Sequence, residues 1–210
     1  GLHLFVAIGW LGYEAAFLQT RPYRAMHRLG VVLEDAPCPS DRGYWEAVLT
    51  RRMVQIARLA REVPIAGVAI DFEPYATKYY SQAGAPGILE VDGVGGIGRD
   101  VCFCDLCFGG FLHSKGIPLT PKEVAPDQRD GYLVEHGYIT SPEEDRAGQG
   151  AYFDYLRRQW HVFARDTERA VHKENPDLLL GFLPGTEDAV ARAWGRPDMP
   201  VVAFSESGYM

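Results

Sequence analysis

The chain has 210 residues, of which 47% are hydrophobic and 23% charged, and its formal net charge is -7. This length suits one domain with a substantial core, and the negative charge argues against a nucleic-acid partner, which needs clustered Lys and Arg. No apolar run approaches the roughly 20 residues that cross a bilayer, which argues against a membrane protein. We expect a soluble protein, cytoplasmic or secreted, and a homo-oligomer is compatible with the sequence.

Four apolar runs read as buried strands, at residues 3–11, 64–72, 177–184 and 200–206. They lack the polar alternation of half-exposed strands, and runs of this kind are typical of parallel sheets that are covered on both faces. Residues 30–35 are a candidate fifth strand.

Two amphipathic helices are predicted between these strands, at about 44–62 and 151–173, because apolar residues recur there at helical spacing. A shorter helix is expected over residues 105–114. The stretches 74–101 and 115–148 are rich in Gly, Pro and charge, and we expect them to be long loops. Loops of this length in a compact domain usually carry function or are disordered.

The order of strands and helices predicts repeated βα units. Two architectures share this order, the eight-fold barrel and the doubly wound sheet. A full barrel typically takes about 250 residues, so we predict a (β/α) TIM-barrel type fold that is partial or compressed. Residues 1–210 would form one catalytic-type domain. Because the chain begins with Gly1 and not Met, we expect a processed chain or a fragment of a longer one.

The stretch AGVAIDFEPY ends a predicted buried strand with two carboxylates, Asp71 and Glu73. Side chains alternate along a strand, so both acids share a face with Gly67 and Ala69, and Pro74 then stops further strand pairing. In α/β folds ligands bind at the carboxyl ends of the strands. The pair is therefore a candidate acid/base site, and a capping or salt-bridging pair is the alternative.

Aromatic residues lie close to these acids or at a second strand end. Tyr75 and Tyr79 follow the pair, and Trp10 lies at the end of the first predicted strand. Aromatic rings suit the C–H faces of sugars, although they are also ordinary core residues. We predict these three residues to be substrate-binding platforms for a carbohydrate.

Three of the four cysteines lie in the segment C-F-C-D-L-C, at Cys102, Cys104 and Cys107, and the fourth is Cys38. Closely spaced thiolates can converge on one tetrahedral zinc ion, with a distant fourth ligand closing a structural site. Disulfides and unliganded thiols are alternatives, but cysteines two apart pair poorly as disulfides. We therefore predict a structural Zn²⁺.

Together these motifs resemble the glycoside hydrolases related to family 42 β-galactosidases, over roughly residues 36 to 112. The resemblance implies that Glu73 is the acid/base, and that the zinc ligands are Cys38, Cys102, Cys104 and Cys107. The chain departs from the family at Phe72, which stands where the family has Asn. The family's nucleophile lies on a later strand, where Glu206 is the candidate.

IDFEPY also resembles the strand motif of family 18 chitinases, which again makes Glu73 the proton donor. We therefore expect a glycosidase that acts in carbohydrate metabolism. The alternative is a non-catalytic, barrel-derived carbohydrate-binding or structural module that lacks a nucleophile. A zinc redox or metal-dependent hydrolase is disfavoured, since no His or carboxylate accompanies the cysteines.

Overall fold

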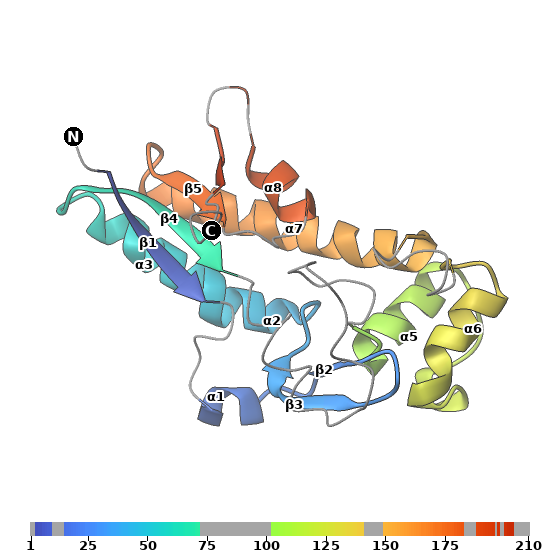
Figure 1. Ribbon diagram of the computed structural model, residues 1–210. Coiled ribbons are helices and arrows are strands. Elements are labelled where there is room, and N and C mark those ends of the chain that lie inside the picture. The colour runs from blue at the N-terminus through green and yellow to red at the C-terminus, as the bar shows by residue number, and fades with distance from the viewer. Residues whose placement is uncertain are drawn as a thin grey trace, which may run out of the picture.

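The structure is a computed structural model, and it is shown in Figure 1. It describes residues 3–9, 15–71, 102–140, 149–182, 188–195, 197 and 200–203. None of the helices in these segments is both long and apolar enough to span a membrane.

Four strands form one parallel sheet in the order β1-β4-β5-β6. They coincide with the four apolar runs and comprise β1 (Leu4–Gly9), β4 (Ile65–Asp71), β5 (Leu179–Phe182) and β6 (Val202–Ala203). Strand β4 is hydrogen-bonded to β1 on one side and to β5 on the other, and its Val68 and Ile70 are fully buried. The sequence order of the strands is also their spatial order, as expected for successive βα units.

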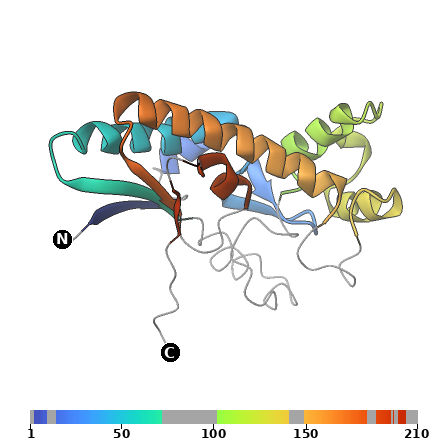
Figure 2. The same cartoon turned by 90° about the horizontal axis from the view of Figure 1, so that it is seen from above.

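One face of this sheet is covered by helices that lie side by side, α3 and α7 (Figure 2). The first belongs to a continuous helical segment that comprises α2 (Arg42–Tyr44), the π-helical η1 (Trp45–Thr50) and α3 (Arg51–Leu59). The second is α7 (Ala151–Glu174), against which the short α8 (Asp188–Trp194) packs. Both long predicted helices are therefore confirmed.

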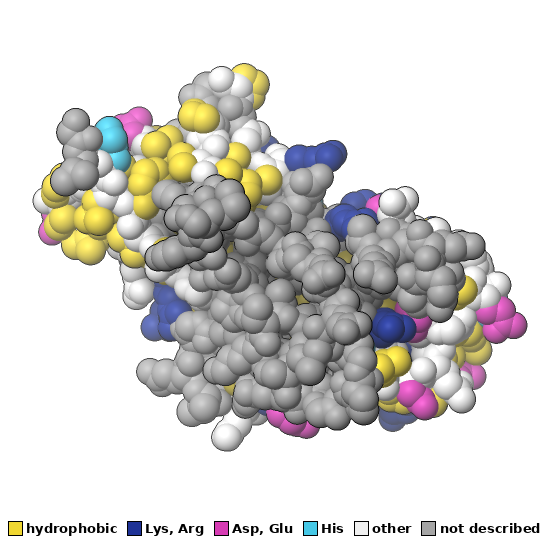
Figure 3. Space-filling model, in the orientation of Figure 1, with side chains coloured by type: hydrophobic (Ala, Val, Ile, Leu, Met, Phe, Trp, Pro, Cys, Tyr) yellow, Lys and Arg dark blue, Asp and Glu magenta, His cyan; other side chains and the backbone are white. Residues whose placement is uncertain are grey.

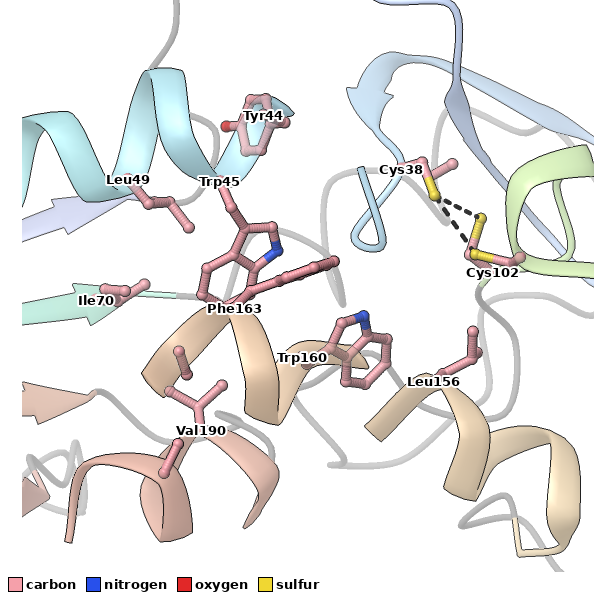
Figure 4. Close-up of a cluster of buried hydrophobic side chains, with 14 of the residues drawn as sticks. Cys38, Tyr44, Trp45, Leu49, Ile70, Cys102, Leu156, Trp160, Phe163 and Val190 are labelled. Atoms are coloured by element: carbon pink, nitrogen blue, oxygen red, sulfur yellow. Dashed lines mark hydrogen bonds between the residues drawn. The ribbon is translucent and has the colours of Figure 1, made fainter. Parts of the chain in front are cut away.

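Away from the sheet the molecule is built from short elements, some of which lie around the N-terminal part of α7 (Figure 1). They are α1 (Ala15–Gln19), β2 (Arg24–Met26), β3 (Val32–Pro37), α5 (Asp105–Ser114), the 3-10 turns η2 (Pro121–Glu123) and η3 (Pro126–Gln128), and α6 (Arg129–Glu135). A single hydrophobic core joins the two ends. It runs from Val68 through Trp45 and Trp160 to the cysteines, as Figure 4 shows for its central part.

The prediction of a (β/α) barrel, complete or partial, is wrong. The described residues form a four-stranded parallel sheet and a separate two-stranded antiparallel sheet, with six strands in total and no barrel. The candidate strand at 30–35 became β3, which pairs with β2 and not with the main sheet. The cause is a tight turn in which the His27 N–H donates to Val31 O at 2.8 Å and Gly30 adopts φ +80°, so the chain reverses immediately.

The prediction of a long loop over 115–148 is also wrong for the described part, which holds η2, η3 and α6. Pro121 and Pro126 suggested irregular structure, but each begins a short helical turn. Proline suits the first helical position, because the missing N–H has no helical partner there and its φ is already close to the helical value. The side chain of Leu133, on the apolar side of α6, is fully buried in the core.

The edge of the sheet at β1 is apolar on the side shown in Figure 3, where hydrophobic side chains gather over this end of the molecule. Leu4 is 52% exposed. Within the described residues β1 pairs only with β4, so it forms an edge of the parallel sheet.

Candidate metal centre

The four cysteines lie together in the buried interior, with all four sulfur atoms within 4.8 Å of one another. The Cys38 Sγ lies 3.4 Å from Cys104 Sγ, 3.4 Å from Cys107 Sγ and 3.9 Å from Cys102 Sγ. Figure 4 shows Cys38 and Cys102 pointing toward each other from separate segments. A disulfide would need about 2.0 Å between sulfurs. A zinc ion with four bonds of about 2.3 Å makes a tetrahedron with edges of about 3.8 Å, which fits these spacings.

The first arm of the site is the turn that follows β3. The Cys38 N–H donates to Tyr23 O at 3.3 Å, and the Cys38 carbonyl accepts from the Asp41 N–H at 3.0 Å. The Asp41 carboxylate caps the start of α2 by accepting from the Gly43 N–H at 3.0 Å. It also accepts two hydrogen bonds from Arg21, of 2.5 and 2.7 Å. The turn that presents Cys38 is therefore held at both ends.

The second arm is the start of α5. Cys104 is the N-cap of this helix and Cys107 lies three residues further, so both side chains fall on one face of the first turn. The third sulfur, of Cys102, accepts from the Met26 N–H at 3.3 Å, and the Phe103 N–H donates to Met26 O at 2.9 Å. The strand β2 thus binds the second arm directly.

A buried tyrosine from α7 completes the support of this arm. The Tyr152 hydroxyl donates to the carbonyl oxygen of Cys102, and its ring packs against Phe103 with centroids 5.4 Å apart. Burial, and then the negative charge of the nearby cysteines, raise the pKa of Tyr152 well above its usual range. Tyr152 therefore remains a neutral donor.

Burial dominates the ionisation of two of the thiols. It raises the pKa of Cys38 and of Cys107 well above the usual range, because a thiolate loses its hydration there. Hydrogen bonds from Cys102, Cys107 and Cys38 lower the pKa of Cys104 instead. A divalent cation would stabilise all four thiolates, so metal binding would release protons.

The chemistry of the donors limits what this site can hold and do. Four soft thiolates in tetrahedral arrangement are typical of zinc or of iron–sulfur sites. A centre with four protein thiolates has no open position for water or substrate, which is the arrangement of structural zinc sites. The structure therefore provides a buried cluster of four cysteines that is able to bind a metal ion.

The structure describes the C-terminal end of β4, where the predicted acidic pair begins, only in part. The backbone of Asp71 ends β4 and pairs with Gly9 of β1, and β5 lies on the other side of β4. The side chain of Asp71 lies outside the described residues, and so do all the other predicted catalytic and substrate-binding residues, namely Glu73, Glu206, Trp10, Tyr75 and Tyr79.

The sequence analysis missed two arginines that contact the cysteine arms, Arg21 and Arg129. Arg129 is 2% exposed, and it donates to Phe103 O at 2.7 Å and to Asp105 Oδ1 at 2.6 Å. One sequence signal could have pointed to them. An aspartate stands three residues after a cysteine in both arms, in C-P-S-D at 38–41 and in C-F-C-D at 102–105.

Comparison of the chain with protein-family models, with curated proteins and with solved structures finds no match in any of the three.

Proposed function

We propose that the chain is a glycoside hydrolase that cleaves O-glycosidic bonds by carboxylate acid/base catalysis and is stabilised by a structural zinc ion. One observation carries the proposal. Asp71 ends β4, which lies between β1 and β5 in a parallel sheet, and Glu73 follows two residues later. In open α/β sheets ligands bind outside the carboxyl ends of the strands, so this is the position where paired acids meet a substrate.

Glu73 is the proposed general acid, which protonates the glycosidic oxygen as the bond to the sugar breaks. Asp71 tunes the acidity of Glu73 or orients the substrate. Glu206 is the proposed second carboxylate, because it follows β6, which runs parallel to β4 and therefore ends at the same edge of the sheet. Trp10 follows Gly9 of β1 at this edge and is a proposed sugar platform, together with the tyrosines after Glu73.

The distance between the carboxyl groups of Glu73 and Glu206 decides the stereochemical outcome. Inverting glycosidases hold their carboxyl groups about 6.5–9.5 Å apart and retaining ones about 5–5.5 Å. Glu206 would activate the attacking water in the first case and would be the nucleophile in the second.

The metal has a structural part in this proposal. The segment 72–101 carries Glu73 and the two tyrosines, and it begins where β4 is hydrogen-bonded in the sheet and ends next to Cys102. A zinc ion bound by the four cysteines would fix the far end of this segment. It also ties that end to Cys38, which precedes the helix that covers the sheet.

The test is the Glu73→Gln variant, assayed against a panel of aryl glycosides, with Glu62→Gln as the matched control because Glu62 is exposed in the turn that follows α3. We expect turnover to be lost in the first variant and unchanged in the second, with equal zinc content in both. Unchanged turnover in Glu73→Gln would refute the assignment. Glycan binding by the wild type without hydrolysis would favour the non-catalytic carbohydrate-binding module instead. The anomer first released, read by NMR, distinguishes inversion from retention.

A further inference from the structure

The two arms of the metal centre share a local design. In each arm a cysteine is followed three residues later by an aspartate, and an arginine from a distant segment binds that aspartate. The pairs are Arg21–Asp41 for the arm of Cys38 and Arg129–Asp105 for the arm that begins at Cys102. We propose that Arg21 and Arg129 are positioning residues of the metal centre, which hold the two arms in ligand geometry. This inference rests on the zinc ion of the proposed function.

Arg129 uses all three nitrogens of its guanidinium on the second arm and its surroundings. Besides Asp105 it donates to three backbone carbonyls, of Phe103 at 2.7 Å, of Pro121 at 3.0 Å and of Val124 at 3.4 Å, and it lies 5.2 Å from the centre of the Phe108 ring. The Phe103 peptide lies between two of the ligand cysteines. By binding its carbonyl, Arg129 fixes the orientation of the backbone on which both sulfurs depend.

The burial of Arg129 indicates that these bonds matter. A buried guanidinium is costly unless its donors are satisfied, and Arg129 is 2% exposed. The Phe103 carbonyl lies outside the helices and strands, so it needs a partner of another kind. Arg129 also approaches Met26 Sδ at 3.7 Å, and the Met26 N–H donates to the sulfur of Cys102. One side chain thus links α6, β2 and the cysteine segment.

Arg21 has the same role on the first arm with fewer contacts. Its two hydrogen bonds hold the Asp41 carboxylate, and the backbone N–H of Asp41 donates to the Cys38 carbonyl. The Arg21 side chain is 25% exposed and Asp41 only 4%. Because water competes for a partly exposed pair, the contribution of Arg21 to metal affinity should be smaller than that of Arg129.

A competition titration of zinc against a chromophoric chelator tests the inference. The variants are Arg129→Lys and Arg21→Lys, and Arg58→Lys is the control, because Arg58 makes an exposed 2.8 Å pair with Glu174 on the helices over the sheet. Lysine keeps the charge but lacks the planar fork. We expect Arg129→Lys to weaken zinc binding 10- to 100-fold, which is typical when a residue that supports the metal ligands is lost. Arg21→Lys should weaken zinc binding less, and Arg58→Lys should leave it unchanged.

Two further measurements separate the possible failures. Asp105→Asn removes the charge of a 55% exposed carboxylate and should weaken zinc binding with the circular dichroism spectrum unchanged, even if Arg129→Lys does not fold. Wild-type affinity in Arg129→Lys, or in Asp105→Asn, would overturn the inference while the zinc site stands. A wild-type chain that takes up no zinc would instead overturn the metal proposal and this inference with it.

Discussion

Removal of the metal should lower the stability of the fold by an amount that follows from the chain path. Cys38 and Cys102 are 64 residues apart in sequence, so an ion that joins them closes a long loop in the unfolded chain. If the metal acts as a cross-link, the chain-entropy relation for a loop of this length predicts about 4 kcal/mol at 25 °C. For a chain of this size each kcal/mol shifts the unfolding midpoint by about 2–4 °C, so the expected loss is roughly 8–16 °C.

The assay is thermal unfolding followed by circular dichroism, under reducing conditions, for zinc-loaded and chelator-treated protein. Addition of zinc to the treated protein should restore the midpoint. Cys38→Ser is the informative variant, because it removes the only ligand of the first arm and should make the midpoint insensitive to chelator. Equal midpoints for loaded and chelated wild type, within about 2 °C, would refute the reasoning that the ion joins the two arms.

Three further predictions concern the sheet and the support of the metal centre. Gly67→Ala should destabilise the protein by about 1–3 kcal/mol in denaturant titrations, because a Cβ there would lie 2.7 Å from the backbone oxygen of Leu179 on the neighbouring strand. Tyr152→Phe should cost about 1–3 kcal/mol, since the buried carbonyl of Cys102 loses its donor. The backbone N–H and the hydroxyl of Thr120 donate to the Glu123 carboxylate in a capping box, and these hydrogen bonds lower the pKa of Glu123 below its usual 4.5. The carboxylate therefore stabilises the folded state above that pH, and this stabilisation is lost as the pH falls through the lowered pKa.

Each of these has a matched comparison. Gly131→Ala, in α6, meets no atom within 4 Å and should be neutral or stabilising, so an equal loss in both glycine variants would contradict the steric argument. Tyr138→Phe removes the hydroxyl of a partly buried tyrosine on a different segment, and an equal cost there would remove the special role of Tyr152. For Glu123→Gln, the stability difference from the wild type should shrink as the solution is acidified, and a constant difference would exclude the carboxylate as its cause.

The strands and long helices were predictable because burial leaves a local pattern in the sequence. The run around Val68 and Ile70 is apolar on both faces, and both residues are buried in the parallel sheet. The same pattern does not say how many strands join a sheet or whether the sheet closes, which is why the barrel prediction failed. The prediction also failed to place β3, which pairs with β2 because the chain reverses in the left-handed turn at Gly30. A single glycine in the sequence does not indicate which strand will be the partner.

The metal centre was predictable only in its ligands. Three cysteines within six residues and one distant cysteine are a strong chemical signal, and the structure brings their sulfurs together. The supporting residues were not predicted. Arg129 and Tyr152 donate mostly to backbone carbonyls, which leave no pattern in the sequence. The aspartate that follows a cysteine by three residues in each arm is the one local signal, and it does not say which arginine binds it.

The most direct test of a structural zinc ion in this protein is X-ray absorption at the zinc edge on the purified, reduced chain, together with metal analysis. One zinc per chain, with four sulfur neighbours at about 2.3 Å and no nitrogen or oxygen neighbour, is the result that we predict. A chain that carries no zinc when supplied with it, or a spectrum with fewer sulfurs and bound oxygen or nitrogen, would contradict the account.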